Sequence, residues 1–134
     1  MSTFILEVAT PEKLVVRNDA SEAQIPGSAG MLGILPGHAS LISEIEAGEL
    51  TYILEGKKRT LAVAKGWVQV TANKVRVLVD SCEAPEEIDV KRAEESLKRA
   101  NARLLSPKQD LDIARALNAA KRAQARLEVA RGNS

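Results

Sequence analysis

Six arginines near the C-terminus are spaced in a way that could bind anions. Arg92, Arg99 and Arg103 recur at intervals of seven and four residues, and a second trio keeps the same intervals. The second trio is Arg115, Arg122 and Arg126. At about 100° per residue, this spacing places each trio on one face of a helix. Guanidinium groups fit the oxygens of phosphates and carboxylates, so the trios indicate a nucleotide site, an acidic protein contact, or a solvent-exposed helical face.

The two arginine trios belong to an internal repeat. Residues 88–105 align with residues 111–128 at a shift of 23, and nine of the eighteen positions are identical. The repeat predicts two similar helices. If both helices turn their arginines to the same side, the two stripes form a cationic cleft.

Residue patterns that support catalysis are missing. His38 is the single histidine, and no serine or cysteine near it has the sequence context of an activated nucleophile. A structural role for His38, hydrogen-bonded in a glycine-rich loop, is the favoured interpretation. The single cysteine, Cys82, excludes an intrachain disulfide and a multi-cysteine metal site. We therefore expect a binding or mechanical module with no catalytic residues and no metal.

The composition is that of an ordinary folded protein. Of 134 residues, 45% are hydrophobic and 28% are charged, which separates the chain from disordered sequences. The net charge of +1 and the aromatic content of 2% give little basis for nucleic-acid binding. An adaptor that binds nucleic acid or an acidic protein through its basic helices is nevertheless the alternative function.

The first part of the chain, residues 1–85, alternates between apolar and polar residues with a period of two. Phe4, Leu6 and Val8 share one face of the first predicted strand, and Lys74–Val79 alternates in the same way. This pattern is typical of strands with one buried face. No crossover helices fit between the strands, so we expect an antiparallel sandwich or flattened barrel and no parallel sheet.

The second part, residues 86–134, reads as an antiparallel hairpin of two helices. Ten alanines and no glycine lie between Asp89 and Arg131. Asp89 can cap the first helix, and residues 106–109 resemble a capping box that starts the second. The expected apolar stripes are Val90, Ala93, Leu97, Ala100 and Leu104, then Ile113, Leu117, Ala120, Leu127 and Ala130. With few large apolar residues the hairpin is marginal alone, and we expect it to move.

The glycine-rich loop at residues 30–38, GMLGILPGH, resembles the G-x-L-G-I-L-P-G-H loop of the epsilon subunit of rotary proton-translocating ATP synthases. Three further segments occur in that family's order and spacing: VATPE at residues 8–12, GWVQV at 66–70 and KVRVL at 74–78. The resemblance covers essentially the whole chain. It implies a sandwich of about ten strands in residues 1–85 and a regulatory helical hairpin in residues 86–134.

The resemblance also implies a function. The chain would be a non-catalytic rotor subunit of the central stalk, coupling the catalytic head to the proton-driven c-ring. Its sandwich would bind the gamma subunit and the c-ring, and its hairpin would extend to the alpha and beta catalytic subunits and inhibit ATP hydrolysis. No nucleic acid is implied as a partner, and membrane contact would come through the complex alone. The implied location is the cytoplasmic face of the bacterial plasma membrane, or alternatively the stromal side of the chloroplast thylakoid.

Specific site residues follow from the resemblance. Some bacterial members bind ATP as a regulatory ligand through an I/L-D-x-x-R-A motif, although no cofactor is required. The matching positions here are Ile88, Asp89, Arg92 and Ala93, with Arg99, Arg122 and Arg126 as phosphate contacts. The implied c-ring and stalk contacts are Gly30, Met31, Leu32 and His38, and the implied inhibitory basic face is Arg103, Arg115, Arg122 and Arg126. Many members carry glutamate at the position of Met31, so the ring contact here is expected to be more apolar.

Overall fold

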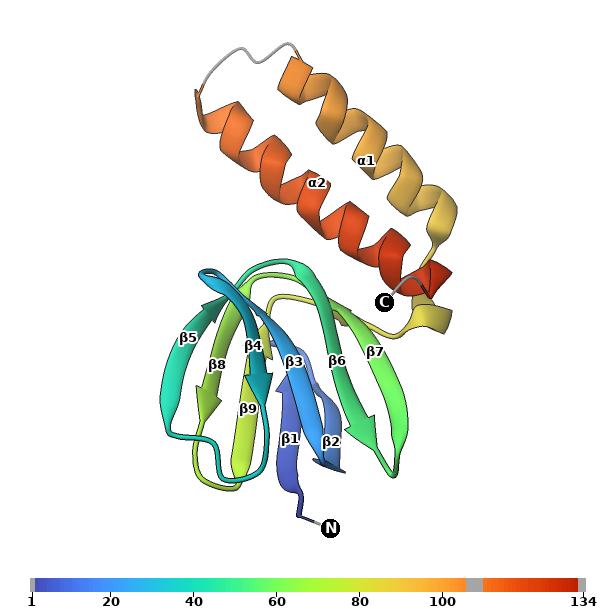
Figure 1. The fold of residues 1–134 in the computed structure, drawn as a ribbon. Helices are drawn as coiled ribbons and strands as arrows, with labels where there is room; N and C mark the ends of the chain where they lie inside the picture. The colour runs from blue at the N-terminus through green and yellow to red at the C-terminus, as the bar shows by residue number, and fades with distance from the viewer. Residues whose placement is uncertain (1, 106–109, 133–134) are drawn as a thin grey trace.

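Ten strands are followed by two long helices in a computed structural model that describes residues 2–105 and 110–132 (Figure 1). The strands are β1 (Phe4–Ala9), β2 (Leu14–Ala20), β3 (Glu22–Gly27), β4 (Gly30–Ile34), β5 (Leu41–Ile45), β6 (Gly48–Leu54), β7 (Lys57–Val63), β8 (Gly66–Val70), β9 (Lys74–Val79) and β10 (Cys82–Glu83). A short 3-10 helix, η1 (Pro85–Glu87), leads into α1 (Val90–Leu105) and α2 (Asp110–Arg131). The predicted order of a β domain followed by a helical hairpin is confirmed.

The strands form a two-layer sandwich. One layer holds β10, β7, β6, β3 and β4, and the other holds β5, β8, β9, β1 and β2 (Figure 1). The layers are joined where Gly27 of β3 pairs with Ile45 of β5. Side chains from both layers fill the space between them, and Leu6, Ile25 and Leu50 are fully buried there.

The predicted period-two alternation agrees with burial in most strands. Phe4, Leu6 and Val8 are buried in β1, and the three valines of β9 face the same core. Strand β7 differs, because Leu61, Ala62 and Val63 are all buried in succession. Leu61 and Val63 face the sandwich core, whereas Ala62 is covered from outside by the helical hairpin.

One pair of strands departs from the expected antiparallel arrangement. Strands β1 and β9 pair in parallel, with Glu7 opposite Arg76 and Val8 opposite Val77. The expectation of no parallel pairing rested on the absence of crossover helices between the strands. Here the connection is the whole intervening chain from β2 to β8, which satisfies the length that parallel pairing needs without any helix.

The two helices pack against each other along a seam of small side chains. Ala93 and Ala100 of α1, and Ala116 and Ala123 of α2, are almost completely buried. These four residues are equivalent in the 23-residue repeat, so each helix presents the same face to its partner. Ala93 and Ala100 of the predicted first stripe lie in this seam, but Val90 of that stripe is 36% exposed. Ile113 and Leu117 of the second stripe are 39% and 45% exposed. Because alanines form the close contact, the larger residues lie outside it.

The helix ends at Asp89 and Gly132, the two that the structure describes, agree with the predicted caps. The Asp89 carboxylate accepts a hydrogen bond from the Arg92 amide at 3.1 Å and so caps α1. At the end of α2, Gly132 has φ +68° and its amide donates to the carbonyl of Val129. The predicted capping box at residues 106–109 lies outside the described residues.

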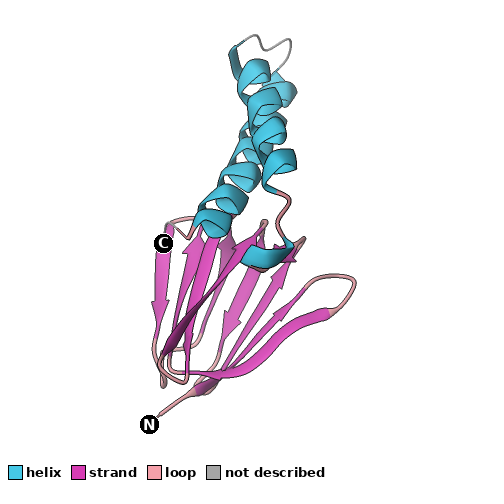
Figure 2. Cartoon of the chain, turned by 90° about the vertical axis from the view of Figure 1, so that its right-hand side faces the viewer, coloured by secondary structure: helices cyan, strands magenta, loops and turns pink. Residues whose placement is uncertain are grey.

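The hairpin stands on one end of the sandwich and contacts it through α2 (Figure 2). Helix α2 packs against β6 and β7, and Val129 forms a small buried cluster with Ala62 and Ile88. This cluster is far smaller than the sandwich core. Apolar burial therefore contributes less to docking of the hairpin than to the sandwich core, and polar contacts add to it.

Candidate functional site

The residues of the I-D-x-x-R-A match lie at the start of α1, where three of the four pack against neighbours or cap the helix. Ile88 is buried beneath α2, Asp89 caps α1, and Ala93 lies in the seam between the helices. Arg92 is exposed. The motif therefore fixes where α1 begins and how it packs, and of its four side chains it leaves the guanidinium of Arg92 free for solvent or a ligand.

The two arginine trios lie on the same side of the hairpin. The buried alanines show that repeat-equivalent positions of α1 and α2 face each other. In an antiparallel pair related in this way, residues offset equally from the seam point to one common side. Because the chain reverses between the helices, Arg92 in the first turn of α1 lies at the same end of the hairpin as Arg126 in the C-terminal part of α2. Arg99, Arg103 and Arg115 lie further from the sandwich and are exposed.

Arg126 is occupied by an ion pair that the sequence did not indicate. Its Nε donates a hydrogen bond to the carboxylate of Glu83 in β10, across the junction between hairpin and sandwich. The two side chains are 31% and 30% exposed, so the pair is partly shielded from water. The contact could not be predicted from local sequence patterns, because its two partners are 43 residues apart in the sequence.

A second polar contact joins α2 to the turn between β5 and β6. The Lys121 ammonium is 3.7 Å from the Glu46 carboxylate, and both side chains are more than 40% exposed. Lys121 and Arg122 also line a cavity of about 200 Å³ together with Glu44 and Glu46. Among the described residues, Arg122 is thus directed toward the acidic rim of the sandwich, whereas Arg99 donates to the Ser96 hydroxyl on its own helix.

The four residues assigned by resemblance to the c-ring and stalk are distributed along β4 and the loop after it. Gly30 begins β4 with φ +129°, a conformation suited to glycine. Met31 is 59% exposed, while Leu32 packs against the core. His38 follows the other end of β4, so the set extends along the whole strand and into the loop after it.

The glycine-rich loop is held by its own hydrogen bonds. The His38 amide donates to the Leu35 carbonyl at 3.1 Å, and its ring Nδ1 lies 2.6 Å from the Ala39 carbonyl oxygen. The Gly37 amide donates to the carbonyl of Ala72 in the β8–β9 turn. These contacts are consistent with the expected structural role of His38 within this loop, and the implied contact of His38 with the stalk stays a prediction.

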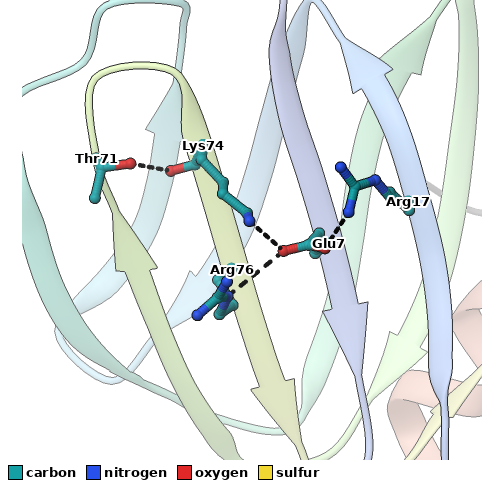
Figure 3. A network of polar contacts seen from close by, with 5 residues as sticks. All are labelled: Glu7, Arg17, Thr71, Lys74 and Arg76. Atoms are coloured by element: carbon teal, nitrogen blue, oxygen red, sulfur yellow. Dashed lines mark hydrogen bonds and ion pairs between the residues drawn. The ribbon is translucent and has the colours of Figure 1, made fainter.

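A cluster of charges on the outer face of β1, β2 and β9 was missed by sequence reasoning (Figure 3). The Glu7 carboxylate is approached by Arg17 at 3.0 Å, Lys74 at 3.0 Å and Arg76 at 3.5 Å. Arg17 and Arg76 are the direct cross-strand neighbours of Glu7. The pairing of β1 with β9 was the missing information, because it brings residues almost seventy positions apart side by side.

Among the residues that the structure describes, Glu7 and Cys82 have clearly perturbed pKa values. The hydrogen bond from Lys74, helped by the charges of Lys74, Arg17 and Arg76, holds the pKa of Glu7 below its ordinary value of 4.5. Burial raises the pKa of the Cys82 thiol to about 11, and the nearby carboxylates of Glu87 and Glu83 add to the rise. The Cys82 thiol is therefore protonated and weakly nucleophilic at neutral pH.

The part of the chain that the structure describes holds no group of three or more histidine, cysteine, aspartate or glutamate side chains placed to bind a metal ion. Neither helix, over its described residues, has the length and apolar character needed to cross a membrane.

Comparison with known proteins agrees with the two-part architecture. Residues 3–85 match the ATP synthase delta/epsilon chain beta-sandwich domain, and residues 86–131 match the delta/epsilon chain long alpha-helix domain. The ATP synthase epsilon chain of Koribacter versatilis is 53% identical over 102 residues, which is 76% of this chain and 72% of the relative. The epsilon chain of Solibacter usitatus is 46% identical over 105 residues, 78% of each chain.

Solved structures support the fold. A chain in the Euglena gracilis mitochondrial ATP synthase (OSCP/F1/c-ring, rotational state 1) superposes with a TM-score of 0.83 at 22% identity, covering 97% of this chain and 82% of that one. A chain of the Tetrahymena thermophila mitochondrial ATP synthase central stalk and c-ring gives 0.61 at 18% identity, covering 97% and 95%. With both of its domain models matched along nearly the full length, the chain belongs to the ATP synthase delta/epsilon chain family.

Proposed function

We propose that the chain is a non-catalytic subunit of the central stalk of a proton-translocating ATP synthase. The observation that carries this proposal is the match of both domains to the delta/epsilon family, together with relatives named as epsilon chains. In this role the sandwich is the rigid part, with a continuous core, and it binds the gamma subunit and the c-ring. The subunit needs no cofactor and is peripheral to the membrane, on the cytoplasmic side of a bacterial plasma membrane.

The hairpin acts as the regulatory part. Its contact with the sandwich consists of a small apolar cluster and two ion pairs, so docking is weak compared with the sandwich core. Undocking frees α2 and its basic residues. The extended hairpin then reaches the acidic surfaces of the alpha and beta subunits and inhibits ATP hydrolysis, with Arg103, Arg115, Arg122 and Arg126 facing those subunits.

ATP stabilises the docked hairpin. Arg92 and Arg126 lie on the same side and at the same end of the hairpin, with Arg99 and Arg122 on that side as well. Triphosphate oxygens would neutralise these guanidinium groups, which otherwise repel one another. A ligand that binds the docked form better than the extended form shifts the population toward the docked form. High ATP therefore favours the form that does not inhibit.

Co-elution with the gamma subunit tests the stalk assignment. The purified chain and the gamma subunit are mixed and separated by gel filtration, and we expect a stable one-to-one complex. If the two proteins elute separately, the stalk assignment is wrong. Binding to duplex DNA with a steep dependence on salt, in place of the gamma complex, would support the adaptor alternative.

Isothermal titration with ATP and then ADP tests the nucleotide site. We expect saturable binding that prefers ATP and is lost in the Arg122→Ala plus Arg126→Ala variant. Glu83→Gln is the matched control, because it breaks the ion pair of Arg126 but keeps the guanidinium, and its ATP binding should be retained. Unchanged ATP affinity in the double-alanine variant would show that the arginines do not hold the phosphates.

A further inference from the structure

One row of side chains on the outer face of β10, β7 and β6 lies at the junction with the docked hairpin. Ala62 of β7 pairs with Glu83 of β10 on one side and with Glu49 of β6 on the other. Directly opposite residues of antiparallel strands point to the same face of a sheet. Because Val129 of α2 covers Ala62, the two glutamates flank the apolar contact between sandwich and hairpin.

The two glutamates of this row differ in their surroundings. The Glu83 carboxylate accepts a hydrogen bond from Arg126 of α2. In contrast, Oε1 of Glu49 is fully buried and has no hydrogen-bond partner, and it is the one side-chain nitrogen or oxygen in this condition among the described residues. Helix α2 packs on β6, so docking of the hairpin accounts for the loss of water around this oxygen.

The cations of α2 that reach the sandwich pair with other carboxylates. Arg126 contacts Glu83, and the Lys121 ammonium lies 3.7 Å from the Glu46 carboxylate. Within the described part of the chain, no ion pair includes Glu49. A carboxylate oxygen that loses water without gaining a donor raises the free energy of the state in which this happens. Undocking of α2 returns the oxygen to water, so the cost falls on the docked form alone.

We propose that Glu49 is a release residue, whose carboxylate destabilises the docked hairpin and keeps the docked and undocked forms close in free energy. This inference rests on the proposed function, in which the hairpin leaves the sandwich. It adds a residue that opposes docking, next to Glu83, which favours it. A ligand shifts an equilibrium only by its differential affinity for the two forms. The balance between the two glutamates therefore sets how small a difference in affinity is enough to move the hairpin.

Hydrogen exchange of the full-length chain tests the role of Glu49. Glu49→Ala removes the carboxylate and adds no new contact. Amides around Val129 in α2 should then exchange about fivefold or more slowly than in wild type, the factor that corresponds to one relieved buried acceptor. Glu49→Gln keeps the size of the side chain and removes the charge. Its amides should also slow, by a smaller factor, because a neutral amide oxygen is less costly to bury than a carboxylate oxygen.

Glu22→Ala is the matched control. Glu22 of β3 is a partly exposed glutamate that pairs with Ile53, four residues along β6 from Glu49 and so about 13 Å further along the strand. Exchange in α2 should be the same in Glu22→Ala as in wild type. Amides of the sandwich core, such as that of Leu6, report whether a variant changes the stability of the whole domain.

Slower exchange that is confined to α2 in both Glu49 variants, with Glu22→Ala unchanged, establishes the release residue. Unchanged or faster exchange in α2 of the Glu49 variants would overturn the inference, because Glu49 would then be neutral or would support docking. Equal slowing in the sandwich core and in α2 would also overturn it, since the effect would be one of general stability.

ATP hydrolysis by a rebuilt ATP synthase complex separates this inference from the proposed function. With Glu49→Ala, less of the hairpin is undocked, so hydrolysis should be faster than with wild type. If exchange in α2 slows as expected but hydrolysis stays the same, Glu49 opposes docking as inferred, whereas inhibition by the undocked hairpin is wrong. If hydrolysis responds to Glu83→Gln while exchange and hydrolysis are both unchanged in Glu49→Ala, inhibition by the hairpin holds and the release residue is overturned.

Discussion

The ion pair between Glu83 and Arg126 should set how long the hairpin stays on the sandwich. Changing Glu83 to Gln keeps the size of the side chain but removes its charge. The contact is a charge-assisted hydrogen bond between groups about 30% exposed. Such bonds contribute about 1.5–3 kcal/mol when shielded, and partial exposure reduces this to about 1–2 kcal/mol. At 1.4 kcal/mol per factor of ten, the undocked population should rise roughly five- to thirtyfold.

Hydrogen exchange along the C-terminal half of α2 measures this population directly. Amides around Val129 should exchange faster in Glu83→Gln by the same factor, because undocking exposes the helix surface that packs on β6 and β7. Glu46→Gln is the matched control. Its partner Lys121 lies 3.7 Å away and both side chains are more exposed, so the expected change is less than about threefold.

A double-variant cycle assigns the effect to the pair itself. Arg126→Gln should accelerate exchange about as much as Glu83→Gln, and the two changes together should add little. If Glu83→Gln has no larger effect than Glu46→Gln, the reasoning that this ion pair holds the hairpin is refuted.

Three further predictions concern the sandwich. Gly66→Ala should lower the free energy of unfolding, measured by urea denaturation, by several kcal/mol, because the added Cβ would lie 1.9 Å from the Leu78 carbonyl oxygen. Gly33→Ala is the control and should be tolerated, because the nearest atom to its added Cβ is 3.4 Å away in a flexible side chain. The lowered pKa of Glu7 means that the folded state holds the ionised form more strongly than the unfolded state does. Stability from this group is therefore complete above pH 4.5 and is lost as the pH falls through the folded-state pKa, so the urea midpoint of Glu7→Gln should fall less than that of wild type between pH 6 and pH 3. Because its pKa is about 11, the Cys82 thiol should react with iodoacetamide at pH 8 about a hundredfold more slowly than an ordinary thiol. Unfolding in urea should restore the ordinary rate. Fast alkylation of the folded protein would contradict the buried environment of this thiol.

Local sequence patterns predicted the elements of this fold well where each strand has one buried face. Phe4, Leu6 and Val8 are an example, and so are Asp89 and Gly132 at the helix ends. These patterns depend on neighbours within one turn or one strand. They therefore remain readable without knowledge of the rest of the chain.

Contacts between segments that are distant in the sequence could not be predicted from such local patterns. Ala62 is buried because α2 covers it, and Glu7 is charged yet buried because β1 pairs in parallel with β9. The Glu83–Arg126 pair depends on where the hairpin rests on the sandwich. In α2, the periodicity of Ile113 and Leu117 was misleading, since the seam is made by alanines that allow closer approach.

The candidate site was predicted in part. Equal arginine spacing in the two repeat copies predicted one stripe on each helix and left open whether the stripes share a side. The buried alanines of the seam indicate that they do. The structural roles of Ile88 and Ala93 in packing were not visible from the motif alone. Spacing gives the face of a helix, but which face meets a neighbour depends on the whole fold.

The most direct test of the account is the rate of ATP hydrolysis by an ATP synthase complex depleted of this subunit and rebuilt with wild type, Glu83→Gln or Glu46→Gln. All three should restore ATP-driven proton pumping, since the sandwich is unchanged. Hydrolysis should be slower with Glu83→Gln, because more of its hairpin is undocked and inhibitory, and Glu46→Gln should match wild type. Failure of the wild-type chain to restore pumping, or equal hydrolysis with all three chains, would contradict the account of a stalk subunit that inhibits through its hairpin.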